Sequence, residues 1–333
     1  MAETLRVIQS STSNVPDRES PPIVAGLQAI FDRLADKPLI DTLTGPTRRG
    51  PKGHSVRTLW RCYVTKYVLG LPSTAALLRL LNDNPFIARV CGIESRDRIP
   101  HEATFSRFYA RLSRGDILPL LKDVSRSLVR DCYASVPGFG KRVTMDSTTV
   151  KGWANGAKNF KTDPEAGWSV KRGTQGPTEF VFGWKLHVLV DCETELPISA
   201  SVSAGNIHDA LRASTLLYAA RKLDVKFHPQ YVIADSGYTG ARLDRLIRRQ
   251  FWAKPIIQTN KSHKLTHAKA APIEALAGWK ALYRQRTAVE RVFSRLKGQH
   301  ALNSIRVRRR AKVTVHCYLS LIALQAMAVF PCA

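Results

Sequence analysis

Three acidic residues, Asp146, Asp235 and Glu290, have surroundings that suggest chemistry. Acidic residues are scarce in this chain, which has 26 Asp and Glu against 51 Lys and Arg. Asp146 lies within a run of β-branched residues that predicts a strand, and Asp235 ends a second predicted strand. A carboxylate in an apolar strand costs on the order of several kcal/mol to desolvate unless it is paired or binds a cation. Two structural alternatives stay open: Asp146 capping a turn, and Asp235 only forming the turn before Gly237.

Glu290 belongs to a set of four polar residues with helical spacing. Tyr283, Arg286, Glu290 and Lys297 are separated by 3, 4 and 7 positions. At about 3.6 residues per turn, this spacing predicts one helix that carries all four side chains along one face. The helix then offers a carboxylate flanked by two cations and a phenol. The alternative is a solvated face on which Arg286 simply pairs with Glu290.

Three carboxylates, two on strands and one on a later helix, can hold two divalent cations about 3.5–4 Å apart for attack on a phosphodiester. Mg²⁺ prefers oxygen ligands, so neither His nor Cys is needed. We therefore expect two Mg²⁺ ions, for which Mn²⁺ can substitute. The sequence has no GxxxxGK[ST] loop and no HExxH helix, which argues against nucleotide hydrolysis and zinc proteolysis.

These residues resemble the motifs of DDE transposases from bacterial insertion sequences. The set that ends at Lys297 matches, without a gap, the Tyr-x2-Arg-x3-Glu-x6-Lys signature of a large group of them, the insertion-sequence-four/five type. Asp146 in Val-Thr-Met-Asp-Ser-Thr resembles the first aspartate of the family, and Asp235 in Ala-Asp-Ser-Gly-Tyr resembles its second. The segment from Gly205 to Asp209 and the helical region before residue 135 are also similar to the family.

The resemblance implies an enzyme that cleaves the ends of its own element and transfers their 3′-hydroxyls into target DNA. It implies catalytic and metal-binding roles for Asp146, Asp235 and Glu290. Tyr283, Arg286 and Lys297 would contact DNA. The implied partners are element-end inverted repeats and target DNA, with the protein acting as a homodimer on DNA. A metal-dependent nuclease without strand transfer and a non-catalytic DNA-binding relic of a transposase stay open as alternatives.

The predicted elements divide the chain into an all-helical region and an α/β domain. Residues 1–20 are expected to be a disordered lead-in, 21–135 a helical DNA-binding region that folds alone, and 136–333 a ribonuclease H-like domain with a mixed sheet flanked by helices. Only 54 residues separate Asp235 from Glu290, which excludes a large inserted domain there. We expect a long basic loop at 151–179, a short excursion at 263–278 and a buried helix at 313–330.

The formal charge of +25 calls for a polyanionic partner. Between residues 281 and 312 there are ten Lys or Arg and one Glu. A charge run is usually a solvated face, but next to three acids suited to phosphodiester chemistry it predicts a DNA-binding surface. We assign to it Arg306, Arg308, Arg309 and Arg310. No signal peptide is apparent and no membrane association is expected, so the cytoplasm is the expected location.

Other polar residues receive structural interpretations. Asp191 ends a predicted strand, and Asp209 begins a predicted helix, where the helix dipole favours a carboxylate. His208 is expected to support the structure rather than carry protons. The six cysteines are scattered without a CxxC pair and are expected to be free thiols.

Overall fold

The structure of the protein, a computed structural model, describes residues 22–45, 53–154, 162–171, 178–223, 225–258 and 278–330. The expected lead-in at 1–20 lies outside these residues, and so does all of the 263–278 stretch except its last residue.

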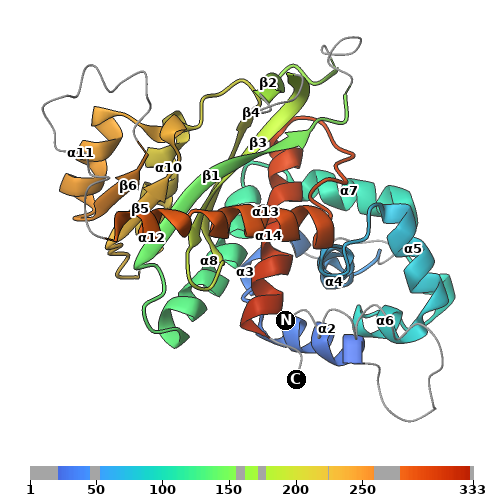
Figure 1. The fold of residues 1–333 in the computed structure, drawn as a ribbon. Coiled ribbons are helices and arrows are strands. Elements are labelled where there is room, and N and C mark those ends of the chain that lie inside the picture. The colour runs from blue at the N-terminus through green and yellow to red at the C-terminus, as the bar shows by residue number, and fades with distance from the viewer. Residues whose placement is uncertain are drawn as a thin grey trace, which may run out of the picture.

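The described part of residues 22–135 is helical, as the periodicity predicts (Figure 1). The short helix α6 (Pro85–Val90) forms because Asn84 caps it, accepting a hydrogen bond from the Ile87 N–H at 3.0 Å, and because Pro85 suits its first turn. The elements are α2 (Pro22–Arg33), α3 (Lys37–Thr44), α4 (Val56–Val68), α5 (Thr74–Asp83), α6 (Pro85–Val90), η1 (Arg96–Arg98), α7 (Glu102–Leu112) and α8 (Leu118–Ser135).

A mixed six-stranded sheet follows, with the order β2-β3-β1-β5-β6 and with β4 paired to β3. β3 is antiparallel to β1, β2 and β4, whereas β1, β5 and β6 run parallel. The strands are β1 (Arg142–Lys151), β2 (Gly167–Lys171), β3 (Glu179–Asp191), β4 (Pro197–Ala204), β5 (Tyr231–Ala234) and β6 (Lys254–Ile257). This mixed sheet with helices on its faces agrees with the expected ribonuclease H-like fold.

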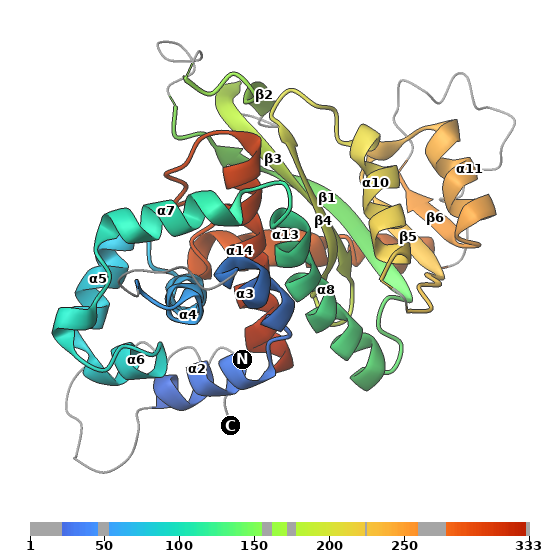
Figure 2. The same cartoon turned by 180° about the vertical axis from the view of Figure 1, so that it is seen from behind.

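Helices cover both faces of the sheet. α12 (Trp279–Arg284) and α13 (Thr287–Gln299) lie on the face seen in Figure 1. α10 (Ala210–Arg221) lies on the opposite face, seen in Figure 2, and α11 (Ala241–Gln250) packs near β6. β3 is buried along nearly its whole length, as expected for a strand covered on both faces.

The 151–179 segment is not entirely a loop, contrary to the sequence-based expectation. Gly167–Lys171 forms β2, which pairs with the first residues of β3. The strand is short and includes Gly167, so its own sequence signal is weak. Its hydrogen bonds to β3 decide its conformation, and Trp168 and Val170 on it stay largely exposed.

The last helix, α14 (Arg310–Val329), joins the two regions. It is the one helix of the described residues long and apolar enough to span a membrane, but 78% of its apolar window is buried inside the protein, which confirms the expected core helix. It packs on α8, α4 and β4. Gln325 accepts a hydrogen bond from the Ser125 hydroxyl at 2.8 Å and donates to the Pro197 carbonyl at 2.9 Å. Part of the core of residues 22–135 is thus supplied by α14. That residues 1–135 fold alone, as the sequence predicts, stays a prediction.

Candidate active site

Asp146 and Asp235 are carried by neighbouring parallel strands. β1 and β5 pair in register, with Thr144 opposite Ile233. Asp146 lies two residues beyond this pairing on β1, and Asp235 directly follows β5. The two carboxylates are close enough for the charge of Asp235 to raise the pKa of Asp146. Both side chains are half-buried. The strand pairing brings together two acids that are far apart in sequence.

Backbone groups hold both carboxylates. Asp146 accepts a hydrogen bond from the Ser147 N–H at 2.7 Å, and Asp235 accepts one from the Gly237 N–H at 3.0 Å. Asp235 thus forms the turn that the sequence allowed, whereas Asp146 lies inside β1 and caps no turn. Burial raises the pKa of Asp146 to about 7, and the charge of Asp235 adds to this. Burial also raises the pKa of Asp235.

Glu290 lies on α13, whose apolar side packs on the sheet while Glu290 itself is exposed. Its Oε1 is 2.8 Å from a guanidinium nitrogen of Arg286, the i, i+4 pair that the sequence left open. The same guanidinium lowers the pKa of both Asp146 and Asp235. Arg286 therefore links Glu290 electrostatically to the aspartate pair.

The helix expected from Tyr283 to Lys297 is in fact two helices, so that prediction is corrected. α12 ends at Arg284, and Gln285 and Arg286 form a turn in which each N–H bonds three residues back. The physical reason is that α12 packs on β5 and β6 while α13 packs on β1 and β3, and a single straight helix cannot follow a twisted sheet across those strands. Tyr283 stays with α12, where it stacks on Trp279 at 4.8 Å.

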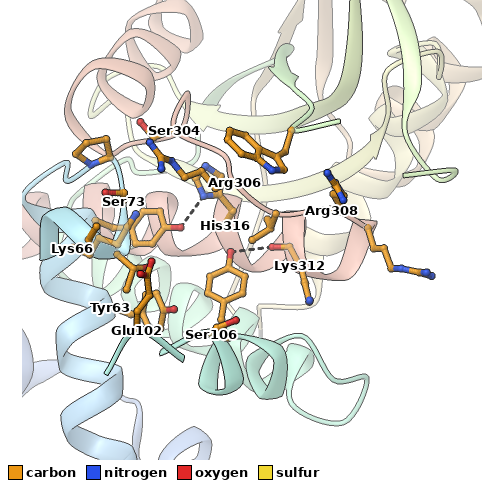
Figure 3. A pocket seen from close by; sticks show the side chains of 18 of the residues that line it. Tyr63, Lys66, Ser73, Glu102, Ser106, Ser304, Arg306, Arg308, Lys312 and His316 are labelled. Atoms are coloured by element: carbon orange, nitrogen blue, oxygen red, sulfur yellow. Dashed lines mark hydrogen bonds between the residues drawn. The ribbon is translucent and has the colours of Figure 1, made fainter. Parts of the chain in front are cut away.

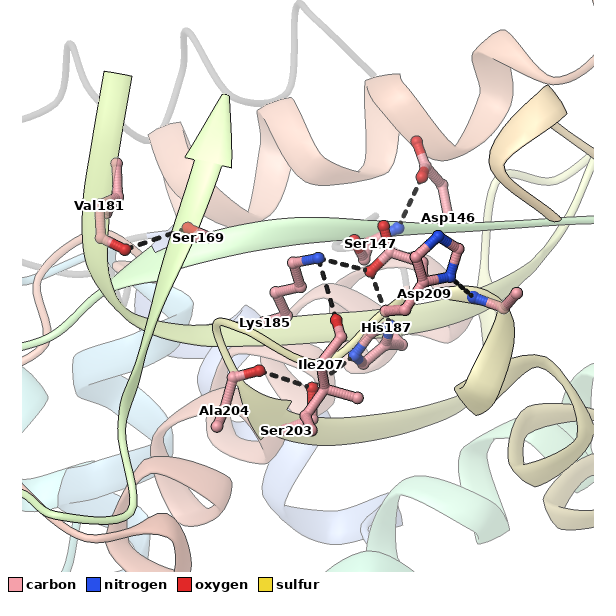
Figure 4. Close-up of polar contacts among 12 residues, drawn as sticks. Asp146, Ser147, Ser169, Val181, Lys185, His187, Ser203, Ala204, Ile207 and Asp209 are labelled. Atoms are coloured by element: carbon pink, nitrogen blue, oxygen red, sulfur yellow. Dashed lines mark hydrogen bonds and ion pairs between the residues drawn. The ribbon is translucent and has the colours of Figure 1, made fainter. Parts of the chain in front are cut away.

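Asp209 was interpreted as a helix-start residue, and it does directly precede α10. Its side chain makes no capping hydrogen bond to α10. Instead it accepts from Lys185 Nζ at 3.0 Å and lies 3.7 Å from His187 Nδ1, which has no hydrogen bond (Figure 4). Its charge raises the pKa of Asp146 and of Asp235. Asp209 thus acts electrostatically on both aspartates, and the Gly205 to Asp209 similarity was the only sequence signal for this.

The other structural interpretations agree with what is seen. The Asp191 carboxylate accepts from the N–H groups of Gly140, Glu193 and Thr194 and so shapes a turn. His208 Nδ1 accepts from the Ala210 N–H at 3.3 Å, at the start of α10. The cysteines within the described residues are free and buried.

Comparisons with known proteins identify the family. Residues 137–325 match the family described as "Transposase DDE domain", which is more than half of the chain. The chain belongs to this family. Residues 15–111 also match a "Transposase domain (DUF772)". No curated protein and no solved structure matches the chain. The helical region and the α/β domain of this transposase thus each match a transposase family.

The two aspartates of the transposase fit a divalent metal ion. Their oxygens are hard ligands, their pKa values are raised by burial and by neighbouring carboxylates, and a bound cation would compensate that charge. The Glu290 carboxylate instead forms an ion pair with Arg286. Within the described part of the chain, no three His, Cys, Asp or Glu side chains are placed to hold a metal together.

The predicted DNA-binding arginines lie beyond α13 and away from Asp235. Arg306 lies over the ring of Trp153, with the guanidinium carbon 5.8 Å from the ring centre. The backbone N–H groups of Arg309 and Arg310 donate to Asp163 and Glu165. Among the ten cations of 281–312, Arg291 and Arg295 instead bind Glu195, so these two are structural.

Proposed function

We propose that the protein cleaves the ends of an insertion sequence and joins their 3′-hydroxyls to target DNA. The observation that carries this proposal is the proximity of Asp146 on β1 to Asp235, which directly follows the neighbouring strand β5, with β1 also in contact with the helix that carries Glu290. Backbone hydrogen bonds hold both aspartates, which supports a role for them as ligands.

Asp146, Asp235 and Glu290 would hold two Mg²⁺ ions, or Mn²⁺ in their place. When bound, such ions activate the attacking oxygen and stabilise the leaving oxygen of a phosphodiester. To bind a metal ion, the Glu290 carboxylate would have to leave its ion pair with Arg286. The freed guanidinium is then available to a DNA phosphate beside the cut, because it faces the same acids.

Lys297 and Tyr283 would position DNA on either side of Glu290. Lys297 lies seven residues along α13 from Glu290, about 10.5 Å at 1.5 Å per residue, a distance that suits a neighbouring phosphate better than the metal. Tyr283 lies on α12 and donates to Gln258 at 3.0 Å. Arg306, Arg308, Arg309 and Arg310 would extend the contact with the DNA backbone.

Recognition of the inverted repeats is assigned to residues 21–135, and catalysis to 136–333. A surface that reads only phosphates cannot choose a sequence, so base contacts must come from another part of the protein. Because an element has two ends, two copies of the chain would act together on DNA. The cytoplasm, where the element DNA is, is the proposed location.

The test compares Asp146→Asn, Asp235→Asn and Glu290→Gln with the wild type on DNA that carries the element ends and Mg²⁺. Each variant should lose cleavage and strand transfer by at least about a hundredfold while DNA binding stays nearly intact, because each removes a metal ligand and no phosphate-binding cation. A variant with near wild-type turnover would remove that residue from the site. Cleavage without joining would favour the nuclease alternative, and a wild type that Mg²⁺ and Mn²⁺ do not activate would favour the relic.

A further inference from the structure

A cavity of about 590 Å³ lies between the helical region and the chain that follows α13. Lys66 of α4, Ser73 and Glu102 line it on one side, and Ser304 and Arg306 face them from the other (Figure 3). Its volume is in the range of small-ligand sites, about 300–1,000 Å³. The cavity is separate from the aspartate pair, none of whose residues lines it.

The lining is strongly basic. Glu102 is its one acidic residue among those described, and its cations come from both regions of the protein: Lys66, Arg306, Arg308, Arg309 and Lys312. Like charges around one cavity repel each other, and the repulsion is larger where water is partly excluded. An anion placed among them would relieve it.

Lys66 is the most unusual of these residues. The residue is only 5% exposed, it lines the cavity, and it forms no salt bridge with an acidic side chain within the described part of the chain. Its Nζ lies 4.2 Å from the centre of the Tyr67 ring. Burial, together with the charge of Arg306, lowers the pKa of Lys66 to about 8. A buried ammonium group without an acidic partner is costly, and such groups are rare unless they serve a ligand.

We propose that this cavity binds a phosphate group, with Lys66 as its innermost cation and Arg306 opposite it. Phosphate suits the site because it carries up to two charges and accepts hydrogen bonds from several directions, which matches a lysine, arginines and the hydroxyls of Ser73 and Ser304. The inference rests on the proposed function in one respect, the source of the phosphate. If the protein acts on DNA, the phosphate belongs to a nucleotide of a DNA strand. Because both regions supply cations, the bound phosphate would hold the helical region against the α/β domain.

The experiment measures binding by the full chain in EDTA, so that the metal site takes no part. The probes are inorganic phosphate and a twelve-nucleotide single-stranded DNA, each titrated against wild type and Lys66→Met. Methionine keeps the volume and removes the charge. Lys122→Met is the matched control, since Lys122 also lies over a tyrosine ring, that of Tyr318, but is half-buried and lies outside the cavity.

Lys66→Met should weaken binding of the DNA strand about tenfold, the size of one charge-assisted hydrogen bond, and Lys122→Met less than about twofold. Loss of inorganic phosphate binding alone would support the site with free phosphate as its source. Unchanged binding of both probes by folded Lys66→Met would overturn the inference. If Lys66→Met fails to fold, Arg306→Gln serves with inorganic phosphate as the probe, because weaker DNA binding would also follow from the DNA contact proposed for Arg306. Weaker phosphate binding is expected, and unchanged phosphate binding would overturn the inference. Asp146→Asn should bind both probes like wild type, because binding is measured in EDTA. The binding result for Lys66→Met therefore does not depend on whether Asp146 is catalytic.

Discussion

Arg286 compensates the acids of the site as they stand in this structure. It pairs with Glu290 and lowers the pKa of both Asp146 and Asp235, while Asp209 raises them. The guanidinium therefore acts on the two aspartates in the same direction as a divalent cation would. Arg286 would therefore affect the reaction in two opposite ways. It competes with the metal for the acids, which lowers the metal affinity, and once displaced it can contact DNA.

We predict that Arg286→Ala binds Mn²⁺ more tightly, by roughly threefold to tenfold, yet cleaves DNA more slowly. The first effect follows from loss of a competing cation near the acids, and the second from loss of a phosphate contact. Mn²⁺ titration followed by electron paramagnetic resonance, together with a cleavage assay at saturating metal, measures both. Arg284→Ala, on the exposed side of α12, is the charge-matched control. Unchanged Mn²⁺ affinity would show that Arg286 does not act on the acids.

At the scale of elements, the basic segment between α13 and α14 combines an anchored backbone with exposed cations. Its backbone is anchored, because the N–H groups of Arg309 and Arg310 bond to Asp163 and Glu165. Its arginine side chains are exposed. A fixed backbone with exposed cations is suited to phosphate contacts, since little order has to be gained when DNA binds.

We predict that binding to element-end DNA weakens steeply with salt and that Arg308→Ala combined with Arg310→Ala makes the slope shallower. Each lost phosphate contact should reduce the log–log slope by about 0.9. Affinity measured across a salt series tests this. Lys226→Ala with Lys254→Ala is the control, because these exposed lysines lie at the opposite end of β5 and β6 from Asp235. Identical slopes for the two double variants would argue against a DNA-binding role for the segment.

At the scale of the whole molecule, buried polar contacts attach α14 to the helical region. His316 donates from Nε2 to the Leu302 carbonyl at 3.0 Å, so its Nδ1 accepts from the Tyr67 hydroxyl at 2.7 Å. His300 approaches the Tyr67 carbonyl at 3.2 Å. This arrangement requires a neutral His316, because a proton on Nδ1 would oppose the tyrosine hydrogen.

The pH dependence of stability follows from these histidines. Burial lowers the pKa of His316 and of His300 to about 4, and the nearby charges of Lys66 and Arg295 act in the same direction. Their ordinary pKa is about 6.5, so below that pH the unfolded chain takes up protons first. Each histidine should therefore lower the free energy of unfolding by up to about 1.4 kcal/mol per pH unit between pH 6.5 and 4. Melting temperatures across that range measure the effect.

A substitution separates this effect from general acid unfolding. His316→Gln keeps a neutral donor and acceptor and should flatten the fall in melting temperature between pH 6.5 and 4, even if it lowers the value at pH 7. His228→Gln alters an exposed histidine and serves as the control. An unchanged slope in His316→Gln would show that this histidine does not drive the pH dependence.

The shared helix leads to a prediction about truncation. A fragment of residues 1–135 lacks α14 and so leaves the apolar faces of α4 and α8 uncovered. We expect it to be helical by far-ultraviolet circular dichroism but to melt without cooperativity and to aggregate. Adding a peptide of residues 310–330 should restore part of the cooperativity. A sharp, reversible melt of the fragment alone would contradict the role assigned to α14.

The local parts of the structure could be predicted from the sequence because they depend on neighbours along the chain. Periodicity and β-branched runs predicted the helical region before residue 135, the buried helix at 313–330 to within a few residues of α14, and the strands at Asp146 and before Asp235. The order of acids and the signature through Lys297 pointed to the transposase family, to which the chain belongs. The catalytic roles of Asp146, Asp235 and Glu290 stay predictions.

Other features depended on contacts between distant segments, which no local pattern carries. The pairing of β1 with β5 brings Asp146 close to Asp235, and sheet twist breaks the helix between Tyr283 and Glu290. Asp209 precedes α10 as its sequence position predicts, but its ion pair with Lys185 and its effect on the two aspartates depend on the tertiary structure. Nothing in the sequence indicated Lys66. Its burial is seen only in the folded protein, where residues from both regions of the chain line the cavity around it.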